Sequence, residues 1–333
     1  MEEVVIIGAG PCGLSAAAEL QDVGFDPLVF EKENIVHSIS CYPINMQFFS
    51  TPELLEIAGI PFNTPHEKPT RLEALHYYRT VAERRNFRIR RYEKVTEVVK
   101  EGDAFRVVSV NKVGVRSETM ARAVVVATGY FDHPNRIGIP GEDLPHVSHF
   151  FREAHPYAGT RVVVIGGSNS AVDAALELER VGAEVTVVYR GPSVSANIKP
   201  WVRPVFDSKV AKGKIELLLE SRVTRIGPAE VEIESNAAGG SGAGRFVRPA
   251  DFVLAMTGFR PDRAFLRSMG VDAPDGTTPP AHNEETMETN VPGLFLAGVV
   301  STGRDANEIF IETGRLHGRK IALALAERRK NGK

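Results

Sequence analysis

Cysteine is scarce in this sequence: Cys12 and Cys41 are the only two in 333 residues. They form neither a CxxC pair nor the set of four ligands that a structural zinc site needs. The sequence therefore predicts no metal site. So few thiols also favour a cytoplasmic protein without structural disulfides.

Long apolar runs and an excess of one charge are missing too. The longest apolar stretches, such as residues 123–127, have the length of a strand, whereas a helix needs roughly 20 apolar residues to cross a bilayer. The start, Met-Glu-Glu, lacks the basic stretch of a signal peptide. The net charge of −2 indicates no basic surface that would neutralise phosphates. We therefore expect neither a membrane nor a nucleic acid as partner.

What the sequence does contain is a strand, a glycine-rich turn and a helix at its beginning. The β-branched run of residues 4–7 leads into Gly8-Ala-Gly10-Pro-Cys-Gly13, and a helix rich in alanine and leucine follows. In a G-x-G-x-x-G turn the glycines let the backbone approach a pyrophosphate, which lies at the helix N-terminus. Glu31 ends the next strand, where a carboxylate accepts hydrogen bonds from an adenosine ribose. The residues expected to contact this first dinucleotide are Gly8, Gly10, Pro11, Cys12, Gly13, Glu31 and Lys32.

A second copy of the pattern begins at residue 161. The strand of residues 161–165 leads into Gly166-Gly-Ser-Asn-Ser-Ala171, where alanine is tolerated last because it only has to fit helix against strand. The next strand ends in Tyr189-Arg190 instead of an acid. An arginine there suits the 2′-phosphate of NADP; the alternative is a solvated surface arginine. The residues expected to contact this second dinucleotide are Gly166, Gly167, Ser168, Asn169, Ser170, Ala171 and Arg190.

Two such fingerprints place the chain in the α/β class, with two Rossmann-like dinucleotide-binding domains. A further glycine turn, Ala127-Thr-Gly129, lies between the fingerprints. Near the end of the chain a strand runs into glycine at Gly298, and residues 307–327 have the pattern of one amphipathic helix. The N-terminal dipole of that helix would face a bound group.

Taken together, these residues resemble the thioredoxin-reductase-like pyridine nucleotide disulfide reductases. The resemblance implies an FAD-binding domain built from residues 1–131 and 259–333, with an NADPH-binding domain, residues 132–258, between them. Further FAD contacts are expected from Gln47, Val95, Thr128, Gly129, Gly298, Asn307 and Ile309. Thioredoxin reductases carry a CxxC pair just before the second fingerprint, but residues 146–157 contain no cysteine. A CxxC relay to thioredoxin is therefore excluded.

Several segments are more similar to the bacillithiol-disulfide reductase family. They are residues 10–13, Phe48-Phe-Ser-Thr51, Ile198-Lys-Pro-Trp201 and residues 305–312. Val299 stands where most thioredoxin-reductase relatives place an Asp that contacts the flavin, so Gly298 and neighbouring amides must serve instead. The resemblance implies an NADPH-driven, FAD-dependent oxidoreductase. Hydride would pass from NADPH to FAD, and the electrons then to a small-molecule disulfide, bacillithiol disulfide.

A protein thiol could form a mixed disulfide with half of such a substrate. Cys12 opens the first helix, where the backbone amides and the dipole should lower its pKa, and the resemblance places the redox-active cysteine there. The alternative for Cys12 is packing beside the pyrophosphate. Cys41 has no thiol near it in the sequence, so we expect it to be buried and structural.

Other functions use the same two domains. A ferredoxin/flavodoxin–NADP reductase or a flavin-dependent monooxygenase would need no cysteine, and a nucleotide-dependent redox sensor would need no turnover. A homodimer or higher homo-oligomer is common for such folds. Further candidates to move a proton or bind an anion are His133, His146, His149, His155, Lys199 and Arg203.

Overall fold

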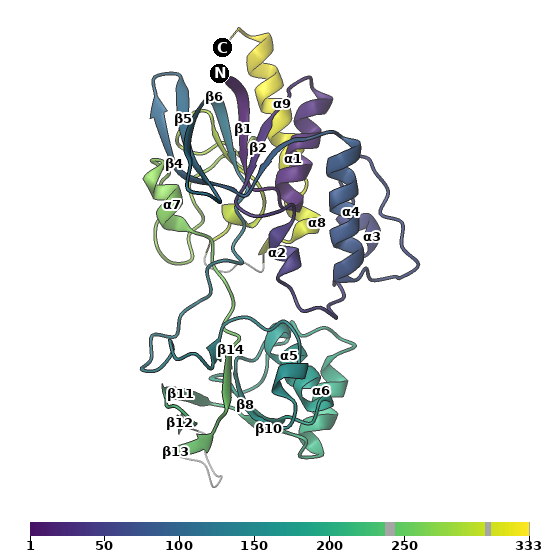
Figure 1. The fold of residues 1–333 in the computed structure, drawn as a ribbon, viewed down its shortest axis with the longest axis vertical. Helices are drawn as coiled ribbons and strands as arrows, with labels where there is room; N and C mark the ends of the chain where they lie inside the picture. Colours follow the sequence, from purple (N-terminus) through teal and green to yellow (C-terminus); the bar gives the residue numbers. More distant parts are fainter. Residues whose placement is uncertain (237–243, 304–307, 333) are drawn as a thin grey trace. The chain divides into compact units, whose positions relative to one another are not determined.

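The computed structural model describes residues 1–236, 244–303 and 308–332. They divide into two compact units, which we describe separately (Figure 1). The first unit holds residues 1–42, 46–133 and 259–333, and the second holds residues 43–45 and 134–258. None of the helices in the described residues has the length and apolar composition needed to span a lipid bilayer.

The first unit is built on a seven-stranded sheet in the order β3-β2-β1-β6-β5-β4, with β15 also paired to β6. β1, β2, β3, β6 and β15 run parallel, whereas β4, β5 and β6 form an antiparallel meander. The strands are β1 (Glu2–Ile7), β2 (Leu28–Glu31), β3 (Arg88–Arg91), β4 (Glu93–Glu101), β5 (Ala104–Asn111), β6 (Arg116–Val126) and β15 (Leu294–Leu296). The end of the chain thus completes the sheet that its beginning starts.

Side chains alternate between the two faces of this sheet. Val4 and Ile6 join a core with the helices, whereas Val5 and Ile7 join a core with the meander and α7. Figure 1 shows α1, α4 and α9 on one side of the sheet and α7 on the other. The helices are α1 (Pro11–Asp22), α2 (His37–Ser40), α3 (Pro52–Leu55), α4 (Arg71–Arg84), α7 (Arg263–Ser268), α8 (Ile311–Gly314) and α9 (His317–Lys330), with the short turn η2 (Gly298–Ser301).

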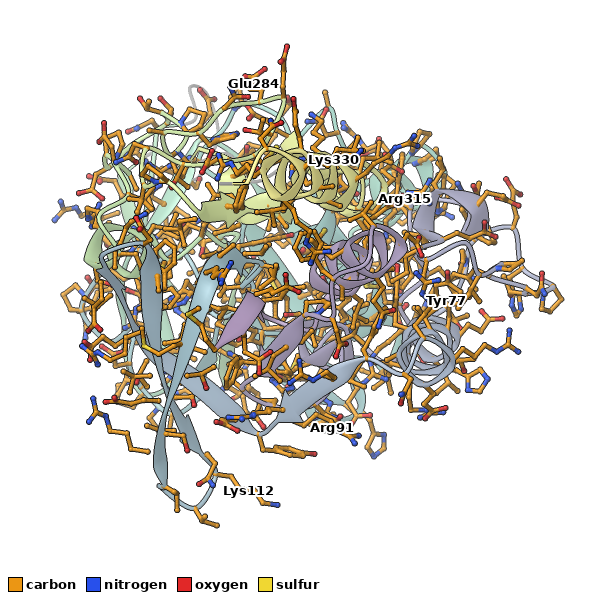
Figure 2. The ribbon with its side chains drawn as sticks, turned by 90° about the horizontal axis from the view of Figure 1, so that it is seen from above. Tyr77, Arg91, Lys112, Glu284, Arg315 and Lys330 are labelled. Carbon is orange, nitrogen blue, oxygen red and sulfur yellow. The ribbon has the colours of Figure 1, made fainter. Side chains whose placement is uncertain are left out.

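The prediction of one continuous C-terminal helix is wrong. α8 ends at Gly314, and α9 begins only at His317; Figure 2 labels Arg315 in the junction. The carbonyl of Arg315 accepts a hydrogen bond from Ser15 Oγ at 2.7 Å, and its guanidinium donates to the Glu56 carbonyl. The junction is therefore tied to α1 and to the residue after α3, which fixes the break. Asn307, the predicted start, lies outside the described residues.

The second unit has a parallel sheet in the order β10-β9-β8-β14-β7 and a smaller antiparallel sheet, β11-β12-β13. One core lies between the parallel sheet and α5 and α6, and another lies between the two sheets. The elements are β7 (Val147–Ser148), η1 (His155–Tyr157), β8 (Arg161–Ile165), α5 (Asn169–Arg180), β9 (Glu184–Val188), α6 (Arg203–Ala211), β10 (Ile215–Leu218), β11 (Ser221–Ile226), β12 (Glu230–Ser235), β13 (Gly244–Pro249) and β14 (Phe252–Ala255). The second fingerprint thus joins a central strand to its helix.

Candidate functional site

The first fingerprint forms a tight turn between β1 and α1. Gly8 has φ of +109°, and a Cβ there would lie 2.5 Å from the Ala127 carbonyl oxygen, so only glycine fits. A Cβ on Gly13 would lie 2.0 Å from Gly8 O, whereas one on Gly10 would meet nothing within 4 Å. The turn is closed toward the sheet and open at Gly10, where a dinucleotide backbone can approach.

The start of α1 supplies the donors for that approach. Gly10 caps the helix without a side-chain hydrogen bond, and Pro11 occupies the first turn. Leu14 N donates to Gly10 O at 2.9 Å, which is the first hydrogen bond of the helix. The N–H groups of Cys12 and Gly13 come before it and have no acceptor within the helix. Amides in this position, together with the helix dipole, fit a pyrophosphate. The turn therefore fits the dinucleotide expected from the sequence.

Glu31 holds the turn in shape. Its Oε2 accepts the Ala9 N–H at 2.8 Å, and its Oε1 accepts the Glu33 N–H at 3.0 Å. The side chain is buried, and burial raises the pKa of the carboxyl group. Each oxygen keeps a second lone pair for a ribose hydroxyl. The neighbouring Lys32 forms an ion pair with Asp132 at 2.5 Å.

Cys12 packs against two glycines from the C-terminal part of the unit. A Cβ on Gly298 would lie 2.8 Å from Cys12 Sγ, and one on Gly314 would lie 2.9 Å from it. The residue as a whole is partly exposed, but its thiol is enclosed, and burial raises the pKa of Cys12 to about 12. The predicted lowering of this pKa is wrong, because burial of the thiol disfavours the charged thiolate.

Gly298 is held by a histidine. Its N–H donates to His317 Nδ1 at 3.1 Å, and its carbonyl accepts from Ser301 Oγ at 2.9 Å. His317 is buried, and burial lowers its pKa to about 4, so the imidazole is neutral at neutral pH. The predicted cofactor contact of Gly298 stays a prediction, but its amide is engaged by His317 and is not free to donate to a cofactor. Within η2, only the neighbouring amides could do so.

The remaining thiol, Cys41, directly follows α2. Its Sγ lies 3.4 Å from His37 Nε2, and the residue is partly exposed. Both cysteines are free. The buried position expected for Cys41 is therefore wrong, since it lies beside an imidazole near the surface.

The other predicted FAD residues differ in how close they lie to the first turn. A Cβ on Gly8 would lie 3.4 Å from Thr128 N, and Gly129 follows with φ of +70°. Ile309 Cγ2 would lie 3.1 Å from a Cβ on Gly314, beside Cys12. These residues surround the turn.

Val95 and Gln47 fit the prediction less well. The Val95 side chain is buried in the core on the meander side of the sheet, so only its backbone could contact a cofactor. Gln47 forms an isolated β-bridge with Thr70 and is exposed.

The second fingerprint repeats the turn between β8 and α5. Gly166 has φ of +146°, and a Cβ there would lie 2.5 Å from Met256 O. The same added Cβ would lie 3.1 Å from the Cβ of the buried Ala171. Ala171 therefore packs closely against the end of the strand, as expected for the last residue of the fingerprint. Ser168 caps α5 without a side-chain hydrogen bond. Its hydroxyl and the first amides of α5, including that of Ser170, fit a phosphate.

Tyr189 takes the place of the acid. Gly166 N donates to Val188 O at 3.0 Å, as Gly8 N does to Phe30 O at 2.7 Å, so Tyr189 corresponds to Glu31. The Tyr189 ring lies over Gly167, where a Cβ would be 2.5 Å from ring Cγ. Arg190, which follows, is exposed and suits a charged partner in solvent.

The chain after Arg190 folds back onto this turn. Asn169 Nδ2 donates to Asn197 O at 2.9 Å, and Asn169 Oδ1 accepts from Lys199 N at 2.9 Å. The Asn169 side chain therefore binds protein, and the predicted contact of this residue with a cofactor stays a prediction. Lys199 and Arg203 pair with Asp173 and Asp207 at 2.8 Å each, so carboxylates already neutralise both cations.

Of the linker histidines, two have defined contacts in the second unit. His146 Nε2 lies 3.1 Å from Gly227 O, and His149 Nε2 lies 3.2 Å from Glu142 Oε1. Burial lowers the pKa of His149. Among the described residues, no group of three or more His, Cys, Asp or Glu side chains could hold a metal ion.

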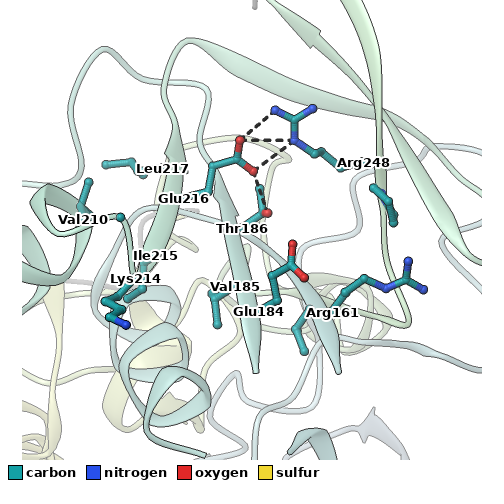
Figure 3. Close-up of a pocket in the computed structure, with 13 residues that line it drawn as sticks. Arg161, Glu184, Val185, Thr186, Val210, Lys214, Ile215, Glu216, Leu217 and Arg248 are labelled. Atoms are coloured by element: carbon teal, nitrogen blue, oxygen red, sulfur yellow. Dashed lines mark hydrogen bonds and ion pairs between the residues drawn. The ribbon is translucent and has the colours of Figure 1, made fainter. Parts of the chain in front are cut away.

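The second unit also has a hollow of about 650 Å³, which is not lined by the second glycine turn (Figure 3). Its lining includes Arg161, Glu184 and Ile215, the first residues of β8, β9 and β10. Arg161 pairs with Asp251 at 2.6 Å, and Arg248 on its rim pairs with Glu216 at 2.8 Å. Because nucleotides bind at the carboxyl ends of parallel strands, this hollow is not the expected nucleotide site.

Two features of the site were missed in the sequence. His317 contacts Gly298 from the start of a distant helix, and no local pattern signals that contact. The absence of an acid at Tyr189 was visible, but not the position of its ring over Gly167.

Comparisons with known proteins agree with this geometry. A family model of pyridine nucleotide-disulphide oxidoreductases matches residues 5–298. The chain is 48% identical over 329 residues to the bacilliredoxin reductase Bdr of Bacillus subtilis, covering 98% of each chain. It is 47% identical to the structure of bacillithiol disulfide reductase Bdr from Bacillus cereus, with a TM-score of 0.95 over 98% of this chain and 99% of that one. Thioredoxin reductase from T. acidophilum, 22% identical with a TM-score of 0.74 over 98% of each chain, shares the fold, which confirms the predicted fold class.

Proposed function

Because this chain belongs to the pyridine nucleotide-disulphide oxidoreductases, and within them to the bacillithiol-disulfide reductase (Bdr) family, we propose that it uses FAD and NADPH to reduce bacillithiol disulfide. The observation that carries the choice of cofactors is the repeated glycine turn. The first turn keeps a carboxylate, Glu31, and the second has Tyr189 and Arg190 at the corresponding places. A dinucleotide without a 2′-phosphate suits the first, and NADPH suits the second.

The chain's own groups bind and orient the two cofactors. The amides of Cys12 and Gly13 at the start of α1 would hold the FAD pyrophosphate, with Glu31 on the ribose. The amides of Ser170 and Ala171 would hold the NADPH pyrophosphate, with Arg190 on the 2′-phosphate. Bound FAD supplies the two-electron chemistry between a nicotinamide and a disulfide.

Cys12 is the thiol proposed to form a mixed disulfide with half of the substrate. The structure sets a condition on this role: a thiol with a pKa of about 12 is almost wholly protonated at neutral pH, and the thiolate is the nucleophile. Substrate binding would have to lower the pKa. Otherwise the disulfide is reduced without a protein thiol.

The names of the relatives suggest two acceptors. The Bacillus subtilis relative is named for a bacilliredoxin, a protein, and the Bacillus cereus structure for bacillithiol disulfide. We propose the small disulfide as the substrate, as the sequence resemblance implies. The test below also includes a protein acceptor, so that the two can be distinguished.

The test is anaerobic oxidation of NADPH by the FAD-loaded protein with one acceptor at a time. The acceptors are bacillithiol disulfide, glutathione disulfide, a bacilliredoxin carrying bacillithiol as a mixed disulfide, ferredoxin, and none. Fast turnover with bacillithiol disulfide alone supports the proposal. Turnover with only the bacilliredoxin, or with only ferredoxin, would show that this protein is the substrate and not bacillithiol disulfide. Equally slow oxidation of NADPH with every acceptor would refute disulfide reduction.

A further inference from the structure

We propose that Asn169 is a positioning residue for the nicotinamide nucleotide, acting as an uncharged clamp that adapts the second turn to a 2′-phosphate. This inference rests on the proposed function, because it takes NADPH as the ligand of that turn. The clamp joins the first residue of α5 to the segment of residues 191–199, which follows Arg190.

Both ends of the Asn169 amide are used. Nδ2 donates to the Asn197 carbonyl at 2.9 Å, and Oδ1 accepts the Lys199 N–H at 2.9 Å. The donor faces an oxygen and the acceptor faces an N–H, so the partners fix the orientation of the amide. One side chain therefore holds two points of the segment against the start of the helix.

Other contacts hold the segment to the same turn. Ser195 N donates to Gly167 O at 2.8 Å, which ties the segment to the turn itself. Val194 and Ile198 are buried in the core beside α5, and the Lys199 ammonium pairs with Asp173 on the helix at 2.8 Å. The segment is thus docked along its length, and Asn169 supplies two of the polar contacts.

In the first unit, a charged side chain holds the glycine turn in shape. There the Glu31 carboxylate binds the amide of Ala9, the middle residue of the turn, at 2.8 Å. At the corresponding place in the second unit, the Tyr189 ring lies between Gly167 and Gly191, where added Cβ atoms would lie 2.5 and 2.7 Å from ring carbons. No carboxylate can occupy that space.

This difference explains why the clamp is an amide. A carboxylate at the strand end would repel a 2′-phosphate, because like charges a few ångströms apart interact unfavourably. Contacts without net charge suit the second turn, and the two Asn169 hydrogen bonds are of this kind, while the Lys199–Asp173 pair beside them is neutral overall. Arg190, directly before that segment, is then the charged side chain at the strand end that would meet the phosphate.

The experiment compares Asn169→Ala with Asn169→Asp. Titration calorimetry on the FAD-loaded protein gives the dissociation constants of NADP⁺ and NAD⁺, and hydrogen exchange reports the Lys199 amide. For Asn169→Ala we expect binding of NADP⁺ to weaken about tenfold, binding of NAD⁺ to change less than about twofold, and the Lys199 amide to exchange faster.

Asn169→Asp keeps the acceptor for Lys199 N–H, but it loses the donor to the Asn197 carbonyl and adds a negative charge. We expect the Lys199 amide to stay protected while NADP⁺ binding weakens at least as much as in Asn169→Ala. Asp207→Asn, which removes only the pair with Arg203 on α6, should change neither measurement. This variant is the matched control for loss of a surface polar contact.

Equal weakening of both nucleotides in Asn169→Ala would make the residue merely structural and overturn the proposal. Unchanged exchange at Lys199 would show that the clamp does not form in solution. If the wild type binds NAD⁺ better than NADP⁺, the proposed choice of NADPH fails, and the exchange data still test the clamp by itself.

Discussion

The backbone amide of Gly298 donates a hydrogen bond to Nδ1 of His317, 3.1 Å away. The bond requires a neutral imidazole with its proton on Nε2, because a charged imidazole has no acceptor. Gly298 also lies against the Cys12 thiol. The protonation state of one buried histidine therefore determines how the glycine beside Cys12 is held.

We expect the protein to lose stability as the pH falls from 6.5 towards 4. Burial lowers the pKa of His317 from 6.5 to about 4, so in this range the unfolded chain binds a proton before the folded chain does. The contribution is complete above pH 6.5 and disappears as the pH falls through the folded pKa. It amounts to about 3 kcal/mol in total.

The measurement is the free energy of unfolding in urea, for the wild type and His317→Asn, at pH 7.5 and at pH 5. Because the variant lacks the titrating group, its deficit relative to the wild type should shrink by about 2 kcal/mol at the lower pH. A deficit of the same size at both pH values would contradict the assignment.

Replacing Cys12 by Ala separates its two possible roles. If its thiolate attacks the disulfide, Cys12→Ala keeps bound FAD and its reduction by NADPH but loses disulfide turnover. Since the pKa of the thiol without substrate is about 12, wild-type kcat/KM for the disulfide, which reports the free enzyme, should then rise about tenfold per pH unit above neutrality. Undiminished turnover in the variant, or a flat pH profile, would remove Cys12 from the reaction and leave it a packing role.

Arg190→Ala tests the choice of nucleotide. Loss of a charged contact to the 2′-phosphate should raise KM for NADPH by about 10- to 100-fold, since hydrogen bonds to charged groups contribute roughly 1.5–3 kcal/mol. KM for NADH should hardly change. Arg203→Ala, which removes an arginine already paired with Asp207, is the control. Similar losses with both nucleotides would place Arg190 outside the 2′-phosphate site.

Gly167→Ala should disturb the second turn, because its Cβ would lie 2.5 Å from the Tyr189 ring. We expect NADP⁺ binding to weaken by at least about tenfold. In the Tyr189→Ala background the same substitution should matter little, because the clash is gone. The two variants thus form a double-mutant cycle with a strong interaction energy. Additive effects would mean that the ring does not rest on the turn in solution.

The sequence predicted what depends on local pattern. Glycine spacing and β-branched runs located both strand–turn–helix units, since a turn such as Gly8–Gly13 allows few backbone conformations. It could not predict contacts between distant segments. For example, no local pattern indicated that the Asn169 side chain binds Asn197 and Lys199. The pKa of Cys12 was predicted in the wrong direction because the sequence showed the helix terminus and not the burial by Gly298 and Gly314.

The discontinuous first unit has a consequence for how the protein is made. β15 pairs with β6, and the first core extends from Val4 to Leu325. During synthesis, residues 134–258 leave the ribosome as a nearly complete unit, while the strand and helix that close the first unit have yet to be translated. The face of α1 that packs on α9 and the edge of β6 at Val124–Val126, where β15 pairs, stay uncovered until then. The nascent chain is therefore most in need of a chaperone during translation of its last segment, and early termination there would spare the second unit but not the first.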